Sequence, residues 1–127
     1  MTRLAGAAAL FVAANILHSA DHVRTGLDRL TPEIMGAGTV LTIAAVVALV
    51  LALREDPRAP IVCTAVGVSG ALGVAAAHIA PHWSALSDPY PDLGLDLLSW
   101  AVMLAEIAAG VVLTVAGARE VTRHSTA

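Results

Sequence analysis

The amino-acid sequence predicts an all-α integral membrane protein, a four-helix bundle that forms one domain over residues 1–127. Two observations favour this fold class over a soluble one. The chain is 57% hydrophobic and only 13% charged, whereas soluble domains are usually about 45–50% apolar and about 25% charged. Four long stretches are also almost free of charged residues. Because these stretches do not alternate as membrane β-strands do, we expect them to be transmembrane helices.

The first two transmembrane helices are expected over residues 4–22 and 33–53. No charged residue occurs between positions 4 and 20 or between positions 34 and 53. Both stretches approach or reach the roughly 20 apolar residues that cross a bilayer core of about 30 Å. The segment Thr31-Pro32-Glu33 offers an N-cap hydroxyl, a proline for the first turn and an acidic residue at the helix N-terminus. These three features together predict the start of the second helix.

The third and fourth helices are expected over residues 60–80 and 95–118. A short polar segment, 54–58, turns the chain between the second and third helices. A proline-rich loop precedes the fourth helix and contains Trp83 and Tyr90, which we interpret as interfacial aromatic residues. Between positions 97 and 118 only one residue is charged, so this stretch also satisfies the requirement for a membrane span.

The distribution of arginine predicts the orientation of the bundle. Residues 24 and 29 fall on one side, and five arginines fall on the other: Arg3, Arg54, Arg58, Arg119 and Arg123. Cytoplasmic loops carry an excess of positive residues. We therefore expect a multi-pass protein of the cell membrane with both termini in the cytoplasm.

The N-terminal segment also permits a different interpretation. Met1-Thr2-Arg3 is followed by an apolar run and by the small-residue sequence Val12-Ala13-Ala14, a pattern that secretory signal peptides share. The apolar run continues past that sequence, which favours a retained helix. Cleavage would leave three helices and would place His18 near the new N-terminus.

Four of the five histidines form two pairs, His18 with His22 and His78 with His82. Each pair is spaced i, i+4, which places both imidazoles on one face of a helix and suits the binding of one metal ion. The pairs end the first and third helices, so both are expected at the same, extracytoplasmic end. The fifth histidine, His124, lies in the polar tail and is expected to be solvated.

Carboxylates are expected at the same end of the bundle. Asp21 shares a helix face with His18, while Asp92 and Asp96 precede or open the fourth helix, where they can also serve as helix caps. Imidazole nitrogen together with carboxylate oxygen suits zinc, iron or copper(II). The predicted ligands of such a centre are His18, Asp21, His22, His78, His82, Asp92 and Asp96. Pro81 disturbs the last turn before His82, which weakens the second pair.

Glu106 is the second candidate for a chemical role. It lies ten residues beyond Asp96, about 15 Å deeper along a helix and close to the middle of the bilayer. A carboxyl group at that depth should face the bundle interior and find a polar partner. We expect that partner to be Asn15, one turn deeper than His18. Glu106 is therefore a candidate catalytic residue, as a proton relay or a metal ligand, and a hydrogen bond that joins two helices is the structural alternative.

These features leave several functions open. The first is an integral membrane metalloprotein with a redox, hydrolytic or metal-handling centre. The second is a membrane electron carrier that binds a b-type haem between histidines of the first and third helices. The third is an accessory membrane subunit without catalysis, and the fourth is an ion- or proton-coupled carrier that works through Glu106. Whether the protein is an enzyme stays open at this stage.

The expected partners are the lipid bilayer and further membrane subunits. The chain has no lysine and no basic patch, which excludes a nucleic-acid-binding function. Glycines in the third and fourth helices should let helices approach closely, within the bundle or in a homo-oligomer or larger membrane complex. These glycines are Gly67, Gly70, Gly73, Gly110 and Gly117.

Overall fold

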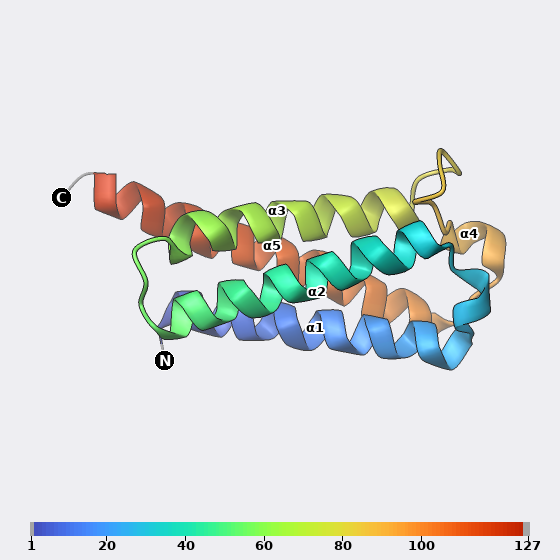
Figure 1. Cartoon of the computed structure of the whole chain (residues 1–127). Coiled ribbons are helices and arrows are strands. Elements are labelled where there is room, and N and C mark those ends of the chain that lie inside the picture. The colour runs from blue at the N-terminus through green and yellow to red at the C-terminus, as the bar shows by residue number, and fades with distance from the viewer. Residues whose placement is uncertain (1, 126–127) are drawn as a thin grey trace.

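The computed structural model describes residues 2–125, which form an all-helical bundle (Figure 1). Within this part of the chain the long helices are α1 (Arg3–Thr25), α2 (Pro32–Leu53), α3 (Ala59–His78) and α5 (Leu97–Ser125). Each is long enough and apolar enough to cross a membrane. The connections contain a short 3₁₀ helix, η1 (Leu27–Arg29), and one helical turn, α4 (Tyr90–Leu93). The predicted fold class is thereby confirmed, whereas the side chain of His124 lies outside the described residues.

The helix ends follow local sequence signals. The Thr31 hydroxyl accepts a hydrogen bond from the backbone N–H of Ile34 at 3.2 Å, and Pro32 stands in the first turn, as predicted for α2. α1 ends at Gly26, whose φ of 109° is in the region that favours glycine. α5 continues past residue 118, where polar residues such as the ion-paired Glu120 and Arg123 extend the helix.

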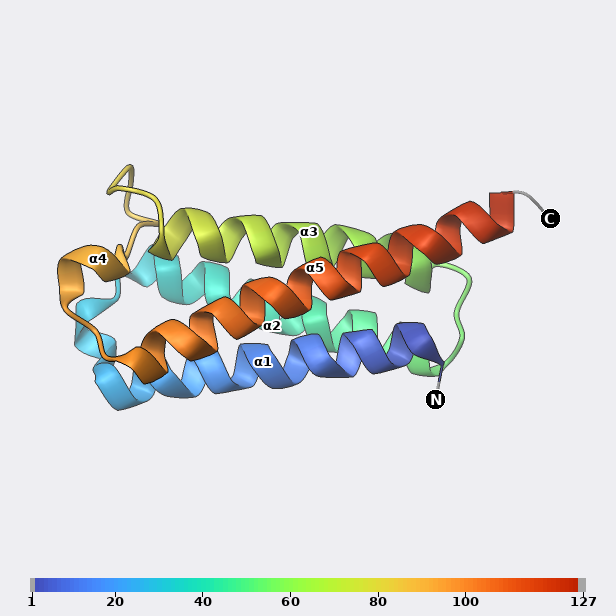
Figure 2. The same cartoon turned by 180° about the vertical axis from the view of Figure 1, so that it is seen from behind.

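Both ends of the described chain lie at one end of the bundle (Figures 1 and 2), beside the connection between α2 and α3. The elements η1 and α4 lie at the opposite end. An even number of spans requires this arrangement. It also brings the C-terminal ends of α1 and α3 together at the end that holds α4, as expected for the two histidine pairs.

Helices α3 and α5 form the most closely packed pair of the bundle. A Cβ atom added to Gly67 would lie 2.6 Å from the carbonyl oxygen of Gly110 and 2.6 Å from the backbone nitrogen of Thr114. The expected close packing is confirmed there and at Gly117, while Gly70 makes room for the ring of Phe11. Gly73 takes no part in close packing within the bundle, because an added Cβ would meet nothing within 4 Å among the described residues.

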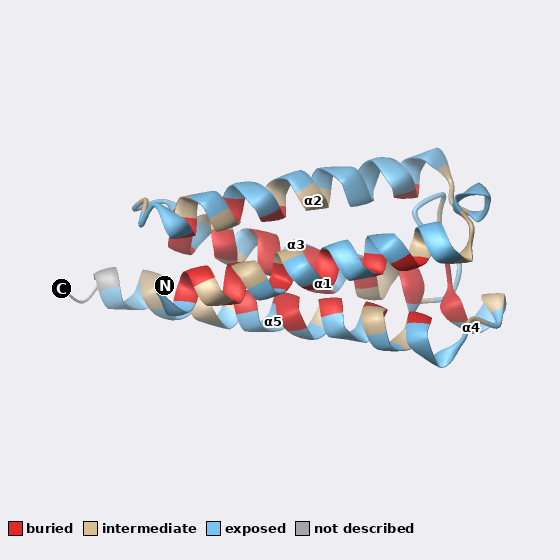
Figure 3. Ribbon diagram, turned by 90° about the horizontal axis from the view of Figure 1, so that it is seen from below, coloured by how far each residue is buried: buried red, intermediate tan, exposed pale blue. Residues whose placement is uncertain are grey.

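Helix α2 packs less completely than the other helices. Figure 3 shows buried residues concentrated between α1, α3 and α5, while α2 is exposed along most of its length. Its buried residues after the first turn are Ala45, Ala48 and Ala52, in its second half. In the first half, Val40 is 68% exposed. The first half of α2 therefore stands away from the bundle at the level of the histidines.

Candidate metal centre

Three histidines come together at the end of the bundle that carries α4. His18 and His22 come from α1, one turn apart, and His78 is the last residue of α3. Each offers one ring nitrogen, and these three atoms all lie within 4.8 Å of one another. His18 and His78 are buried, each with 4% of its surface exposed, and His22 is half-buried. The cluster therefore lies inside the bundle and not on its lipid-facing surface.

The spacing of the three imidazole rings is close to that of a metal centre. Nitrogen ligands at about 2.0–2.1 Å from a tetrahedral ion stand roughly 3.3 Å apart. The ring centroids are separated by 4.6 Å between His18 and His22, 5.0 Å between His18 and His78, and 5.3 Å between His22 and His78. Small side-chain rotations bring nitrogens at such separations onto one ion. The cluster is thus compatible with a metal site.

Two of the imidazoles are oriented by oxygen atoms that contact their Nδ1 atoms. With Nδ1 protonated, His18 donates a hydrogen bond to Oε2 of Glu106. His78 in the same tautomer donates from Nδ1 to the backbone carbonyl of Asp88 at 3.1 Å. In this tautomer both rings carry their lone pair on Nε2, the nitrogen that does not contact these oxygens. Metal-binding histidines usually have such an acceptor on the other ring nitrogen, which raises their basicity and fixes the ring.

Glu106 is 1% exposed and lies at the centre of a buried network. Asn15 donates from Nδ2 to Oε1 of Glu106 at 2.8 Å, so the predicted partner is confirmed. The hydroxyl of Thr42 donates to Oδ1 of Asn15 at 2.7 Å. The second carboxylate oxygen contacts His18, which the sequence analysis did not anticipate. Glu106 therefore connects α5 to α1 and, through Asn15, to α2, and it acts on the histidine cluster by way of His18.

Tyr90 is a part of the site that the sequence analysis missed. Its side chain is 1% exposed, so its interpretation as an interfacial residue was wrong. The hydroxyl lies 3.0 Å from Nε2 of His18. Burial raises the pKa of Tyr90 well above its usual value, and nearby acidic residues, Asp21 first, add to this shift. The phenol is therefore neutral and donates to the Nε2 lone pair. Its position as the chain's one tyrosine, in the loop at the histidine end, was the available signal.

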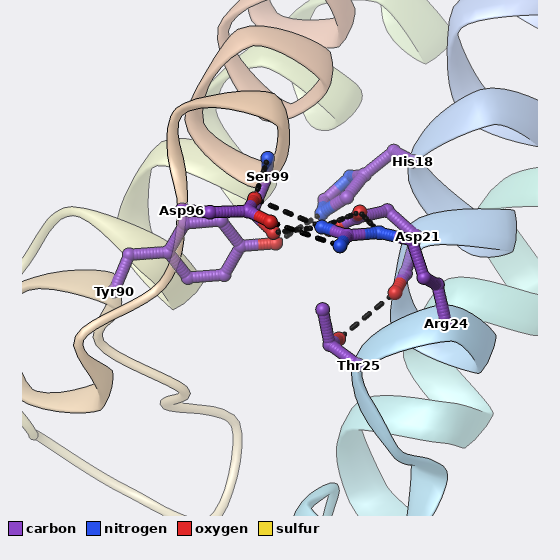
Figure 4. A network of polar contacts seen from close by, with 7 residues as sticks. All are labelled: His18, Asp21, Arg24, Thr25, Tyr90, Asp96 and Ser99. Carbon is purple, nitrogen blue, oxygen red and sulfur yellow. Dashed lines mark hydrogen bonds and ion pairs between the residues drawn. The ribbon is translucent and has the colours of Figure 1, made fainter.

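Asp21 and Asp96 bind an arginine and lie outside the histidine cluster. Figure 4 shows the guanidinium of Arg24 between them. Arg24 donates from Nε to Oδ1 of Asp21 at 2.8 Å, and from its two terminal nitrogens to the carboxylate of Asp96, both at 2.9 Å. It also donates to the hydroxyl of Ser99 at 3.0 Å. This network ties the end of α1 to the start of α5. Oδ2 of Asp21 is buried and has no hydrogen-bond partner among the described residues.

His82 and Asp92, the two other residues predicted as ligands, are both exposed. α3 ends at His78, so His82 lies in the loop and does not share a helix face with it. The reason is Pro81, which disfavours continuation of the helix, as the sequence analysis anticipated. Asp92 lies in the single turn of α4. Neither residue belongs to the three-histidine group.

The ion pair between Arg24 and Asp96 should respond to pH only in the acid range. Arg24 lowers the pKa of Asp96 from 3.8 to about 2. A carboxylate with a lowered folded-state pKa stabilises the folded protein above its unfolded pKa, and this contribution is lost as the pH falls from 3.8 towards 2. The unfolding midpoint of the Asp96→Asn variant should therefore lie below that of the wild type by a constant amount from pH 7 to about pH 5. The gap should close near pH 2. A gap that closes already between pH 7 and pH 5 would contradict this assignment.

Glu106→Gln should weaken metal binding by about 10- to 100-fold, the usual effect of losing a group that is hydrogen-bonded to a metal ligand. The amide oxygen can still accept from Asn15, but the amide nitrogen then faces Nδ1 of His18. That contact favours the tautomer with Nε2 protonated, which removes the lone pair needed by the metal. Competition with a chromophoric chelator measures the change. Thr42→Val removes the far end of the same network and should keep the affinity within about twofold. Equal losses in the two variants would contradict a specific role of Glu106.

Comparisons of the chain with protein-family models, with curated proteins and with solved structures gave no match.

Proposed function

We propose that this protein is a multi-pass cell-membrane metalloprotein whose centre is formed by His18, His22 and His78. The observation that carries the proposal is the convergence of three imidazole nitrogens from two helices within 4.8 Å, inside an apolar bundle. A metal ion shared by the three nitrogens satisfies them together.

The donor set indicates the kind of ion. Three imidazole nitrogens suit zinc, iron or copper(II), and three protein ligands with a fourth position open are typical of catalytic zinc sites. Tyr90, next to Nε2 of His18, is the nearest side-chain hydroxyl for that position. It can bind the ion directly or donate a hydrogen bond to a ligand of the ion. Glu106 contacts His18 through Nδ1 and so acts as the group that orients it.

A haem b group is less well supported than a directly bound ion. Axial imidazoles on opposite faces of a haem have ring centroids roughly 6 Å or more apart, since each metal–nitrogen bond is about 2 Å and the two rings point away from each other. His18 and His78, one of the two pairs from different helices, have centroids 5.0 Å apart. The third imidazole, His22, also lies between 4.6 and 5.3 Å from both. This compact triangle leaves no gap for a macrocycle.

Metal analysis of the purified protein tests the proposal. The full chain, extracted in detergent without chelator and then dialysed against zinc or cobalt(II), should retain about one ion per chain. Cobalt in a site of low coordination number should give intense visible bands. Protein that retains no metal after either treatment contradicts the proposal. A Soret band after haem supplementation, in place of metal uptake, would favour the haem alternative.

A further inference from the structure

A cavity of about 890 Å³ leads to the histidine cluster. It lies between the first half of α2 and the facing surfaces of α1 and α3, where α2 stands away from the bundle. This volume falls within the range of about 300–1,000 Å³ that is usual for small-molecule sites. The cavity is partly open, and most of its lining belongs to three of the long apolar helices. A ligand held there is enclosed mainly by helices that are long and apolar enough to cross a membrane.

Glycines on both walls help to create this space. Gly38 on α2 and Gly73 on α3 both line the cavity, and a Cβ added to either would meet nothing within 4 Å. A glycine within a helix costs about 0.5–1 kcal/mol relative to alanine. At Gly67 that cost is offset by close helix packing, but no helix approaches these two glycines. Their effect on the fold is to keep the cavity wide.

The cavity lining contains residues of two kinds. The polar side chains of the centre, His18, His22 and His78, form one part of its wall. The remainder is lined mainly by aliphatic side chains, among them Ile34 and Leu41. Among the described residues that line the cavity, Glu106 alone has a formal charge, and its carboxylate is already engaged by Asn15 and His18. None of these lining residues is a lysine or an arginine that could receive an anionic group. A polar group on a ligand would therefore bind at the metal.

We infer that the centre takes a membrane-dissolved amphipathic molecule, with its oxygen-bearing head on the metal and its apolar body along the first half of α2. This inference rests on the proposed metal centre and adds the substrate class. The part of α2 that borders the cavity, from residue 34 to residue 44, is about 15 Å long at 1.5 Å per residue. An aliphatic chain of about ten carbons fits within that length, and its burial against aliphatic side chains is favourable.

Titration of the cobalt-loaded full-length protein with two hydroxamates tests the inference. Acetohydroxamate is a metal-binding head alone, and decanohydroxamate carries the same head on a long apolar chain. Both should change the visible cobalt spectrum. Gly38→Leu and Gly73→Leu fill the cavity from opposite walls and should each weaken decanohydroxamate binding at least tenfold, with acetohydroxamate binding and cobalt content unchanged. Partition into the detergent is the same for every variant at one detergent concentration, so it cancels in the comparison.

Gly36→Leu is the matched control. Gly36 is also on α2 and also has nothing within 4 Å of an added Cβ, but it is absent from the cavity lining. This variant should bind decanohydroxamate as the wild type does. Cobalt-loaded variants that all bind decanohydroxamate with the wild-type affinity would overturn the inference and leave the metal centre standing. Failure of the wild type to take up cobalt would instead contradict the metal centre, and the inference would fall with it.

Discussion

His78→Ala should lower the affinity of the centre for its metal ion by at least about 100-fold. This is more than the loss of a group that is only hydrogen-bonded to a metal ligand usually causes. The substitution removes the one ligand that α3 contributes and leaves two imidazoles from a single helix turn. Two imidazoles cannot hold a tetrahedral ion against competition from water and chelators. Metal content after dialysis and competition with a chromophoric chelator both measure this loss.

His82→Ala is the control for the loss of an imidazole at this end of the bundle. His82 follows His78 by four residues but is exposed in the loop after α3, so its removal should leave metal affinity within about twofold of the wild type. Equal helix content by circular dichroism in both variants separates the loss of a ligand from unfolding. If His82→Ala released the metal as completely as His78→Ala, the three-histidine assignment would be wrong.

Gly67→Val should destabilise the bundle by about 2–3 kcal/mol, the upper part of the range for overpacking in a closely packed interior. The added Cβ would lie 2.6 Å from the carbonyl oxygen of Gly110 and from the backbone nitrogen of Thr114. Backbone atoms cannot rotate away as the end of a side chain can, so α3 and α5 must separate. Denaturant titration in mixed micelles, followed by circular dichroism, measures the change in unfolding free energy.

Gly36→Val is the control for the intrinsic effect of replacing a helical glycine by valine. Nothing lies within 4 Å of a Cβ added at Gly36, so stability should change by no more than about 0.5 kcal/mol. Comparable destabilisation of the two variants would mean that helix propensity, and not the contact between α3 and α5, decides the effect. Gly67→Val should also weaken metal binding, because His78 and Glu106 come from the two helices that it separates.

The four spans could be predicted because each depends on a short, continuous piece of sequence. Long stretches without charge select helix in an apolar solvent, since only a helix satisfies its own backbone there. Thr31 and Pro32 mark the start of α2 by local chemistry alone. The pairing of Asn15 with Glu106 could be predicted for a related reason, because the depth of a polar residue in a bilayer follows from its position along a helix.

The composition of the site depended on features that do not follow from sequence spacing. The i, i+4 spacing of His78 and His82 has meaning only while the helix continues, and α3 ends between them. Tyr90 reaches His18 because the loop before α5 folds back over the end of the bundle, as its buried side chain shows. The carboxylates of Asp21 and Asp96 bind Arg24 instead of joining the cluster.

The four long apolar helices and the meeting of the histidine pairs at one end could be read from the sequence, because the charge pattern runs along the chain and odd-numbered spans end on the same side. The structure was needed to show which imidazoles converge, which oxygen atoms accept from His18 and His78, and how far α2 stands away from α3. These depend on how side chains of distant segments pack. Gly67 and Gly73 illustrate the difference, since both are glycines of α3, yet one lies against the backbone of α5 and the other borders an open cavity.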